Sequence, residues 1–151
     1  TRSRLRMLTL YQIASSIGGL VVGTGNRVED FGVGFYTKYG DGGVDLSPIA
    51  DLMKSEVREM ATLLGVSQNI VTAPPTDGLW EDDRTDEEQI GATYEELEWA
   101  MNYIDSYINV DTPQPPTARQ QEVLEIYNRF NMANSHKMRP IPVCTFSKEQ
   151  K

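Results

Sequence analysis

The stretch that decides the fold class is Val21-Val22-Gly23-Thr24-Gly25-Asn26-Arg27-Val28-Glu29-Asp30. Its first residues continue Leu20 into a short apolar run bounded by glycines, which is typical of a strand buried on both faces of a parallel sheet. In open α/β sheets ligands gather at the carboxyl ends of the strands, where this glycine loop lies. Glycines let backbone amides approach a phosphate, Thr24 offers a hydroxyl, and Glu29 offers a hard oxygen ligand for Mg²⁺. The residues alone leave open both a nucleotide site and an ordinary turn.

The segment before this strand predicts a helix over Leu5 to Ala14 that ends near Gly18-Gly19. Helix, buried strand and glycine loop in this order favour an α/β fold. Three arginines, Arg2, Arg4 and Arg6, crowd the start of the helix, where the helix dipole disfavours cations. They indicate either a binding site or a solvated face in the middle of a helix that begins upstream of Thr1.

The residues after the glycine loop predict three further helices. Ser47-Pro48 supplies an N-cap and a first-turn proline for a helix that Gly65 ends. Thr93 and Glu96 form a capping box for the next helix, and a proline-rich link, Pro113 to Pro116, leads to the last, opened by Thr117 and Gln120. The region from Gly23 to Asp45 reads as a long loop with one short helical turn, and long ordered loops are usually functional.

An acidic segment lies between the second and third predicted helices. Residues 77–88 carry seven Asp or Glu side chains against Arg84 alone, after the chain break at Pro74-Pro75. Like charges repel one another and bury little apolar surface. We therefore expect a mobile surface segment whose acids point outward to solvent. Leu79 and Trp80 are expected to be apolar anchors that fold over the candidate nucleotide site.

The composition narrows the class of protein. Fourteen Lys and Arg oppose 22 Asp and Glu, a formal net charge of −8, which argues against a nucleic-acid binder held by a basic surface. One cysteine, Cys144, and one histidine, His136, leave too few ligands for a disulfide or a structural zinc site. The longest apolar run, Ile17 to Val22, is far shorter than the ~20 residues that span a bilayer. We expect one soluble cytoplasmic domain without a secretion signal, and a chain that begins at Thr1 rather than Met fits a piece of a longer protein.

A second glycine-rich stretch, Gly34 to Asp45, holds Lys38 and Asp41 among aromatic residues. Lysine and carboxylates in such a loop can grip a ribose, a carboxylate and an incoming amine, although Gly-Asp-Gly-Gly can equally be a tight turn. Lys54 reads alone as a solvent-facing helix lysine, and His136-Lys137 as cations that complement the end of the last helix.

Taken together, four motifs closely resemble the NAD synthetase family. They are Val-Val-Gly-Thr-Gly-Asn-x-Val-Glu-Asp at 21–30, Gly-Phe-Tyr-Thr-Lys-Tyr-Gly-Asp-Gly-Gly-Val-Asp at 34–45, Ser-Pro-Ile-Ala-Asp-Leu-Met-Lys at 47–54 and Pro-Pro-Thr at 74–76. The resemblance implies an adenine-nucleotide α-hydrolase (Rossmann-like) fold, a parallel sheet flanked by helices, in a homodimer that binds deamido-NAD at the subunit interface. Such ligases use ATP and Mg²⁺ to adenylate the nicotinate carboxylate, and ammonia then displaces AMP.

The resemblance also assigns roles to individual residues. Thr24, Lys54 and Thr76 are expected to bind ATP, and Glu29 to ligate Mg²⁺. Asp41 is the candidate that receives ammonium and takes its proton, and Lys54 is catalytic as well. The residues expected to hold deamido-NAD are Arg4, Lys38, Asp45, His136 and Lys137.

One family motif is missing from these 151 residues: the pyrophosphate-binding Ser-Gly-Gly-x-Asp-Ser loop. Residues 1–151 are therefore expected to be the C-terminal portion of a single NAD synthetase domain, inactive alone, and a glutaminase domain upstream is possible in such proteins. Two alternatives stay open. One is another ATP-pyrophosphatase-type amidoligase, similar to a GMP or asparagine synthetase, and the other is a non-catalytic fragment that acts through its acidic segment.

Overall fold

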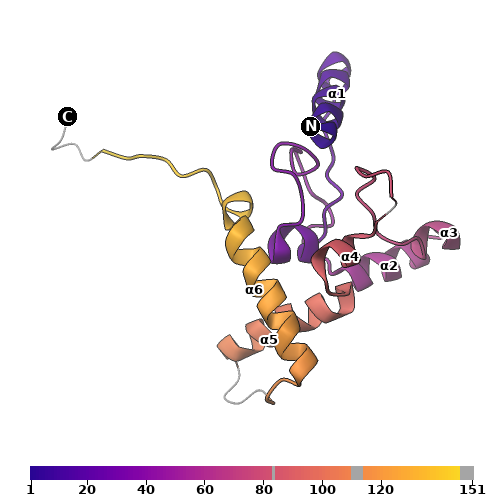
Figure 1. Cartoon of the computed structure of the whole chain (residues 1–151). Helices are drawn as coiled ribbons and strands as arrows, with labels where there is room; N and C mark the ends of the chain where they lie inside the picture. The colour runs from indigo at the N-terminus through magenta and orange to yellow at the C-terminus, as the bar shows by residue number, and fades with distance from the viewer. Residues whose placement is uncertain (83, 110–113, 147–151) are drawn as a thin grey trace.

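The computed structural model describes residues 1–82, 84–109 and 114–146 and contains helices joined by long loops (Figure 1). In Figure 1, α1 stands away from the body of the molecule, and α5 and α6 lie side by side at its opposite end. No helix of the described residues is long and apolar enough to cross a membrane. In chain order the elements are α1 (Arg2–Ile17), the π-helical turn η1 (Arg27–Val33), α2 (Lys54–Leu63), α3 (Gln68–Val71), α4 (Asp86–Ile90), α5 (Tyr94–Asn109) and α6 (Ala118–Met138).

Helix α1 confirms the predicted first helix and ends at Ile17, directly before the glycines that were predicted to end it. Gly18 has φ 66°, the left-handed conformation that glycine adopts most readily, and the N–H of Gly19 donates to the carbonyl of Ala14 at 2.8 Å. Ala14 is buried, but most of the apolar side chains of α1 are exposed. These exposed side chains are Leu5, Leu8, Leu10, Ile13 and Ile17.

The predicted strand is present only as a short parallel pairing. Val22 and Leu46 form an isolated parallel bridge, the N–H of Gly23 donates to the carbonyl of Leu46 at 2.7 Å, and the N–H of Asp45 donates to the carbonyl of Val21 at 2.9 Å. Val21 is 6% exposed and Val22 is 55% exposed, so the prediction of burial on both faces is wrong for the described chain. Successive side chains of an extended segment point to opposite faces, and only one face is covered here. The rest of the predicted sheet stays a prediction.

The predicted helix start at Ser47-Pro48 is also wrong. Residues 48–52 form turns, because the carbonyl of Leu52 accepts from the N–H of Arg27 at 2.8 Å and joins this segment to the glycine loop. Helix α2 begins at Lys54, where the Glu56 carboxylate accepts from the N–H of Met53 at 2.7 Å. Gly65, with φ 75°, follows the end of α2, as predicted.

The core lies where η1, α5 and α6 meet. The predicted capping boxes are present at both helix starts: Thr93 with Glu96 before α5, and Thr117 with Gln120 before α6. Pro113 of the predicted link lies outside the described residues. The innermost side chains from these three elements are Val28, Val33, Leu97, Ala100, Met101, Val123, Leu124 and Tyr127.

Candidate functional site

The loop after Val22 is fixed by a single buried side chain. Asn26, 2% exposed, accepts at Oδ1 from the backbone N–H groups of Val28 and Glu29, at 3.0 and 3.1 Å. An asparagine at this position satisfies donors that the first helical turn leaves unpaired. Asn26 therefore sets the direction in which η1 begins and in which Glu29 projects.

Glu29 and Lys54 form a half-buried ion pair. Lys54 Nζ lies 2.8 Å from Glu29 Oε1, and the two side chains are 22% and 16% exposed. Lys54 occupies the first position of α2, so the corrected helix start is what brings it to η1. The structure thus joins the predicted phosphate-binding lysine to the predicted metal ligand, although the two residues are 25 positions apart.

Two further buried side chains, Asp86 and Tyr94, lie beside this ion pair. Neither was predicted as a site residue. The Tyr94 hydroxyl lies 2.5 Å from Glu29 Oε1 and 3.2 Å from Asp86 Oδ2, and Lys54 Nζ lies 4.8 Å from the centre of the Tyr94 ring. Burial, together with the charge of Glu29, raises the pKa of Asp86 above its usual value. We call Glu29, Lys54, Asp86 and Tyr94 the carboxylate cluster. Both residues lie in stretches, Asp86-Glu87 and Gly91-x-Thr93-Tyr94, that continue the family resemblance, but no role was predicted for them, and the position of Tyr94 on the apolar face of its helix indicates core.

Asp86 corrects the expectation that all the acids point outward. It is only 7% exposed, because α4 forms a turn of helix capped by Thr85 and Glu88 and directs Asp86 toward Tyr94. Glu81, Asp82 and Glu88 are exposed, as expected, and Asp83 lies outside the described residues.

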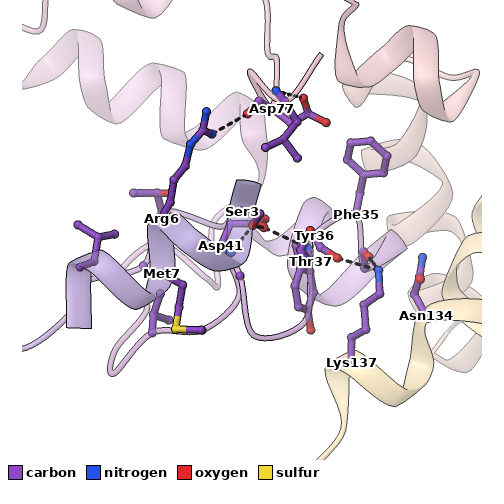
Figure 2. Close-up of a pocket in the computed structure, with 18 of the residues that line it drawn as sticks. Ser3, Arg6, Met7, Phe35, Tyr36, Thr37, Asp41, Asp77, Asn134 and Lys137 are labelled. Atoms are coloured by element: carbon purple, nitrogen blue, oxygen red, sulfur yellow. Dashed lines mark hydrogen bonds between the residues drawn. The ribbon is translucent and has the colours of Figure 1, made fainter. Parts of the chain in front are cut away.

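A cavity of about 580 Å³ lies beside α1, the second glycine-rich stretch and the end of α6 (Figure 2). Three predicted site residues line it: Thr24, Asp41 and Lys137. Leu79 and Trp80, the predicted anchors of the acidic segment, also line it. The remaining predicted site residues do not; they are Arg4, Glu29, Lys38, Asp45, Lys54, Thr76 and His136.

Asp41 ties the glycine turn to α1. Its Oδ1 accepts from the Ser3 hydroxyl at 2.6 Å and from the N–H of Thr37 at 3.0 Å, while its own N–H donates to Ser3 Oγ at 2.9 Å (Figure 2). Among the described residues nothing donates to its second carboxylate oxygen. One oxygen of Asp41 therefore has a structural role and the other is available to a ligand.

The end of α6 brings the predicted cations to the second glycine stretch. Lys137 Nζ donates to the carbonyls of Gly34 and Tyr36, at 2.9 and 2.7 Å, and burial lowers its pKa below the usual value. Lys38 Nζ donates to the carbonyl of His136 at 2.6 Å, and Arg4 Nε to that of Lys38 at 3.3 Å. Hydrogen bonds thus join Arg4, Lys38 and His136, three of the residues predicted to share a ligand, in a network, and Lys137 follows His136 directly in the chain.

Asp45 and Thr76 lie apart from that network. Asp45 accepts at Oδ2 from the N–H of Val21 at 2.7 Å and at Oδ1 from the Tyr11 hydroxyl at 3.2 Å, so it holds the paired segment to α1. Thr76 is exposed and accepts only from the N–H of Gly78, at 3.2 Å, among the described residues. The structure therefore gives Thr76 no hydrogen bond to Lys54 or Glu29 among the described residues, although the carbonyl of the preceding Pro75 accepts from the N–H of Asp86 at 3.0 Å.

Two of the three N-terminal arginines hold the acidic segment against α1. Arg6 donates to the carbonyls of Asp77 and Gly78, at 3.4 and 3.0 Å, and Arg2 donates to the carbonyl of Leu79 at 2.8 Å. The crowding of arginines at the helix start was the signal for this contact, but the sequence did not identify the segment that they bind.

The described residues supply only some of the oxygen ligands that a divalent cation needs. The described residues contain no group of three or more His, Cys, Asp or Glu side chains placed to hold a metal. However, Asp86 Oδ1 is buried without a hydrogen-bond partner, and two carboxylates face one lysine. Magnesium is commonly held by one or two carboxylates plus substrate phosphates and water, so Glu29 and Asp86 fit such an ion when the phosphates are also present.

The comparisons of this chain with a family model, with curated proteins and with solved structures agree on one family. Residues 1–141 match the family model described as NAD synthase. The chain is 50% identical over 103 residues to the NH₃-dependent NAD⁺ synthetase of Methanococcoides burtonii, covering 68% of this chain and 38% of that protein. It is 43% identical over 144 residues to the synthetase of the same name from Alkaliphilus metalliredigens, covering 93% and 52%. Among solved structures, NMN synthetase from Francisella tularensis matches with a TM-score of 0.77 at 33% identity, over 95% of this chain and 54% of that one. The chain thus spans about half the length of the proteins with the longest matches.

Proposed function

Because this chain belongs to the NAD synthase family, we propose that the full-length protein is a ligase that converts deamido-NAD to NAD with ATP and ammonia. A carboxylate repels a nucleophile and offers no good leaving group, so it must first be activated. Transfer of AMP from ATP to the nicotinate carboxylate releases pyrophosphate and creates that leaving group. Attack by ammonia then forms the amide and releases AMP.

The observation that carries the proposal is the pairing of Lys54 with Glu29 directly after the loop that Asn26 fixes. Positive charge held in advance stabilises the charge that develops on a departing pyrophosphate without reorganising water. Lys54 supplies that charge, with Thr24 and Thr76 as further contacts to ATP. Glu29 and Asp86 are the residues that hold Mg²⁺, which offsets charge on the phosphates when bound.

The network at the end of α6 is the proposed site for deamido-NAD. Lys137 lines the cavity, and hydrogen bonds join Arg4, Lys38 and His136, the last of which is next to it in the chain. Asp45 holds the paired segment to α1. Asp41 lines the cavity with one carboxylate oxygen unused, which suits it to receive ammonium and take the proton before neutral ammonia attacks.

The exposed apolar side chains of α1 support a further part of the proposal, that the full-length protein is a homodimer. Exposed apolar side chains commonly mark an interaction site, here with a second copy or with the part of its relatives' length that this chain does not span. Residues 1–151 are proposed as the C-terminal portion of one synthetase domain, and the source of nitrogen is proposed to be ammonia or an upstream glutaminase. Sedimentation of the full-length protein at two concentrations distinguishes a dimer from a monomer.

A second candidate function comes from the match to NMN synthetase. That protein is 33% identical, so amidation of the mononucleotide acid competes with amidation of the dinucleotide. The test supplies the full-length protein with ATP, ammonia and one acceptor at a time: deamido-NAD, the mononucleotide acid, xanthosine monophosphate or aspartate. We expect AMP to form fastest with deamido-NAD. Preference for the mononucleotide acid supports the second candidate, and AMP formation only with one of the last two acceptors supports a different amidoligase.

A further inference from the structure

Tyr94 is the one side chain that contacts every other member of the carboxylate cluster. Its hydroxyl lies within hydrogen-bond distance of Glu29 and Asp86, and its ring lies under the Lys54 ammonium. A cation over an aromatic face is attracted by the negative charge of the ring surface. Tyr94 therefore contacts the lysine and both carboxylates through different parts of one group.

Tyr94 is also held more firmly than the residues that it contacts. It is 1% exposed and begins α5, which the Thr93 and Glu96 capping box starts and whose core residues pack against α6. Its backbone N–H donates to Glu87 Oε1 at 2.8 Å, which joins it to α4 as well. Glu29 and Lys54, in contrast, lie at the first turns of η1 and α2 and retain some exposure. A rigid residue thus touches two less constrained ones.

The hydroxyl is suited to donate. A tyrosine hydroxyl has an ordinary pKa of about 10, so the group carries its proton at neutral pH. Its single proton goes to the nearer acceptor, Glu29 Oε1 at 2.5 Å, while Asp86 Oδ2 lies 3.2 Å from the hydroxyl oxygen. The other oxygen of Asp86, Oδ1, is buried without a hydrogen-bond partner. The second oxygen of each carboxylate is not engaged by Tyr94.

We propose that Tyr94 is a positioning residue of the nucleotide site, which fixes Glu29 by a hydrogen bond and Lys54 by its ring so that both face the phosphates of ATP. The inference rests on the proposed function and adds to it a residue that acts through Glu29 and Lys54. A small displacement of a catalytic group can cost a large factor in rate. Loss of the hydroxyl should therefore affect steps that use ATP and leave the affinity for deamido-NAD unchanged.

The test compares Tyr94→Phe with Tyr127→Phe in the full-length protein. Both tyrosines are buried in the same core, but Tyr127 lies on α6 and makes no hydrogen bond or ring contact with the carboxylate cluster among the described residues. A hydrogen bond to a charged group is worth enough to change a rate about 10- to 100-fold. We expect Tyr94→Phe to lower kcat/KM for ATP by about 10- to 100-fold with the KM for deamido-NAD within about twofold. Tyr127→Phe should leave both values unchanged while lowering the thermal midpoint by a similar amount.

Calorimetric binding of ATP with Mg²⁺ supplies a measurement that does not depend on turnover. The effects of Tyr94→Phe and Glu29→Gln on this affinity should be less than additive, because one acts through the other. Additive effects, or equal losses in the two tyrosine variants, overturn the proposal. If the wild type binds ATP but does not amidate deamido-NAD, the proposed function fails while the binding cycle still decides the role of Tyr94; if the wild type does not bind ATP, both fail.

Discussion

Replacing Glu29 by glutamine in the full-length protein should abolish pyrophosphate release while deamido-NAD still binds. The change keeps the shape of the side chain and an oxygen that accepts from Tyr94, but it removes the charge that faces Lys54 2.8 Å away. It also removes a carboxylate proposed to hold Mg²⁺. We expect pyrophosphate release to fall by at least about 100-fold.

The burial of the ion pair determines how much Glu29→Gln lowers the free energy of unfolding. Removing one partner of a fully buried ion pair costs about 3–5 kcal/mol, and an exposed pair contributes about 0–1 kcal/mol. The Lys54 and Glu29 side chains are 22% and 16% exposed and so lie between these limits. Asp86 also attracts Lys54 and replaces part of the lost interaction. We therefore expect the free energy of unfolding to fall by about 1–2 kcal/mol.

Three measurements separate these effects. Urea unfolding gives the change in stability, calorimetry gives the affinity for deamido-NAD, and a coupled pyrophosphate assay gives the first chemical step. Arg27→Gln is a matched control, because it removes an exposed charge pair with Asp105 and leaves the carboxylate cluster intact. Unchanged pyrophosphate release in Glu29→Gln would refute the assignment of Glu29, and a loss of deamido-NAD binding would show that the variant disturbs more than the ATP site.

Three other predictions follow from the same geometry. Burial and the charge of Glu29 raise the pKa of Asp30 from 3.8 to about 6, so the folded state binds more protons than the unfolded state and stability falls as pH rises from about 4 to 6. Asp30→Asn should remove that dependence and raise the free energy of unfolding by about 1–2 kcal/mol at pH 8, a value reduced because the group is partly exposed. If urea unfolding gives the variant and the wild type the same difference between pH 4 and pH 8, this prediction is wrong. The 151-residue chain alone should make no NAD from ATP, ammonia and deamido-NAD, and turnover by a preparation of confirmed mass would contradict the proposed role of the missing loop. Backbone amides of residues 76–82 and 84–88 should exchange slowly with both substrates bound and quickly without them, and Arg6→Ala should speed exchange at Asp77 and Gly78 in the free protein; equal exchange in every state would mean that this segment is a passive loop.

Local rules in the sequence were sufficient for the helix ends. The glycines after α1 and α2 and the capping boxes of α5 and α6 are encoded within a few residues of one another, and the structure has them where predicted. The start of α2 was predicted wrongly, because the carbonyl of Leu52 pairs with Arg27, 25 positions earlier in the chain. A local pattern such as Ser47-Pro48 contains no information about that partner.

Two members of the carboxylate cluster were predicted as site residues, and two were not. Glu29 and Lys54 were predicted as site residues from motifs, and the structure places them in contact, while their roles stay predictions. Asp86 and Tyr94 lie in stretches that continue the family resemblance, but they received no role, since an acid in an acidic run and a tyrosine on an apolar helix face both have ordinary explanations. Their contact depends on how α4 and α5 pack beside η1, which only the tertiary structure fixes.

The arginine contacts of α1 with residues 77–79 are made to main-chain carbonyls and not to side chains. Every residue type carries the same carbonyl, so recognition of this kind does not depend on which amino acids the segment contains. The side chain at Leu79 is consequently free to be tuned for the cavity that it lines, whereas Asp77 Oδ1 accepts from the N–H of Leu79 at 2.8 Å and so shapes the turn. Insertion or deletion of a residue, by contrast, shifts all three carbonyls away from the guanidinium groups. For the three carbonyls of residues 77–79, the number of residues is therefore under tighter physical constraint than the side chain at Leu79.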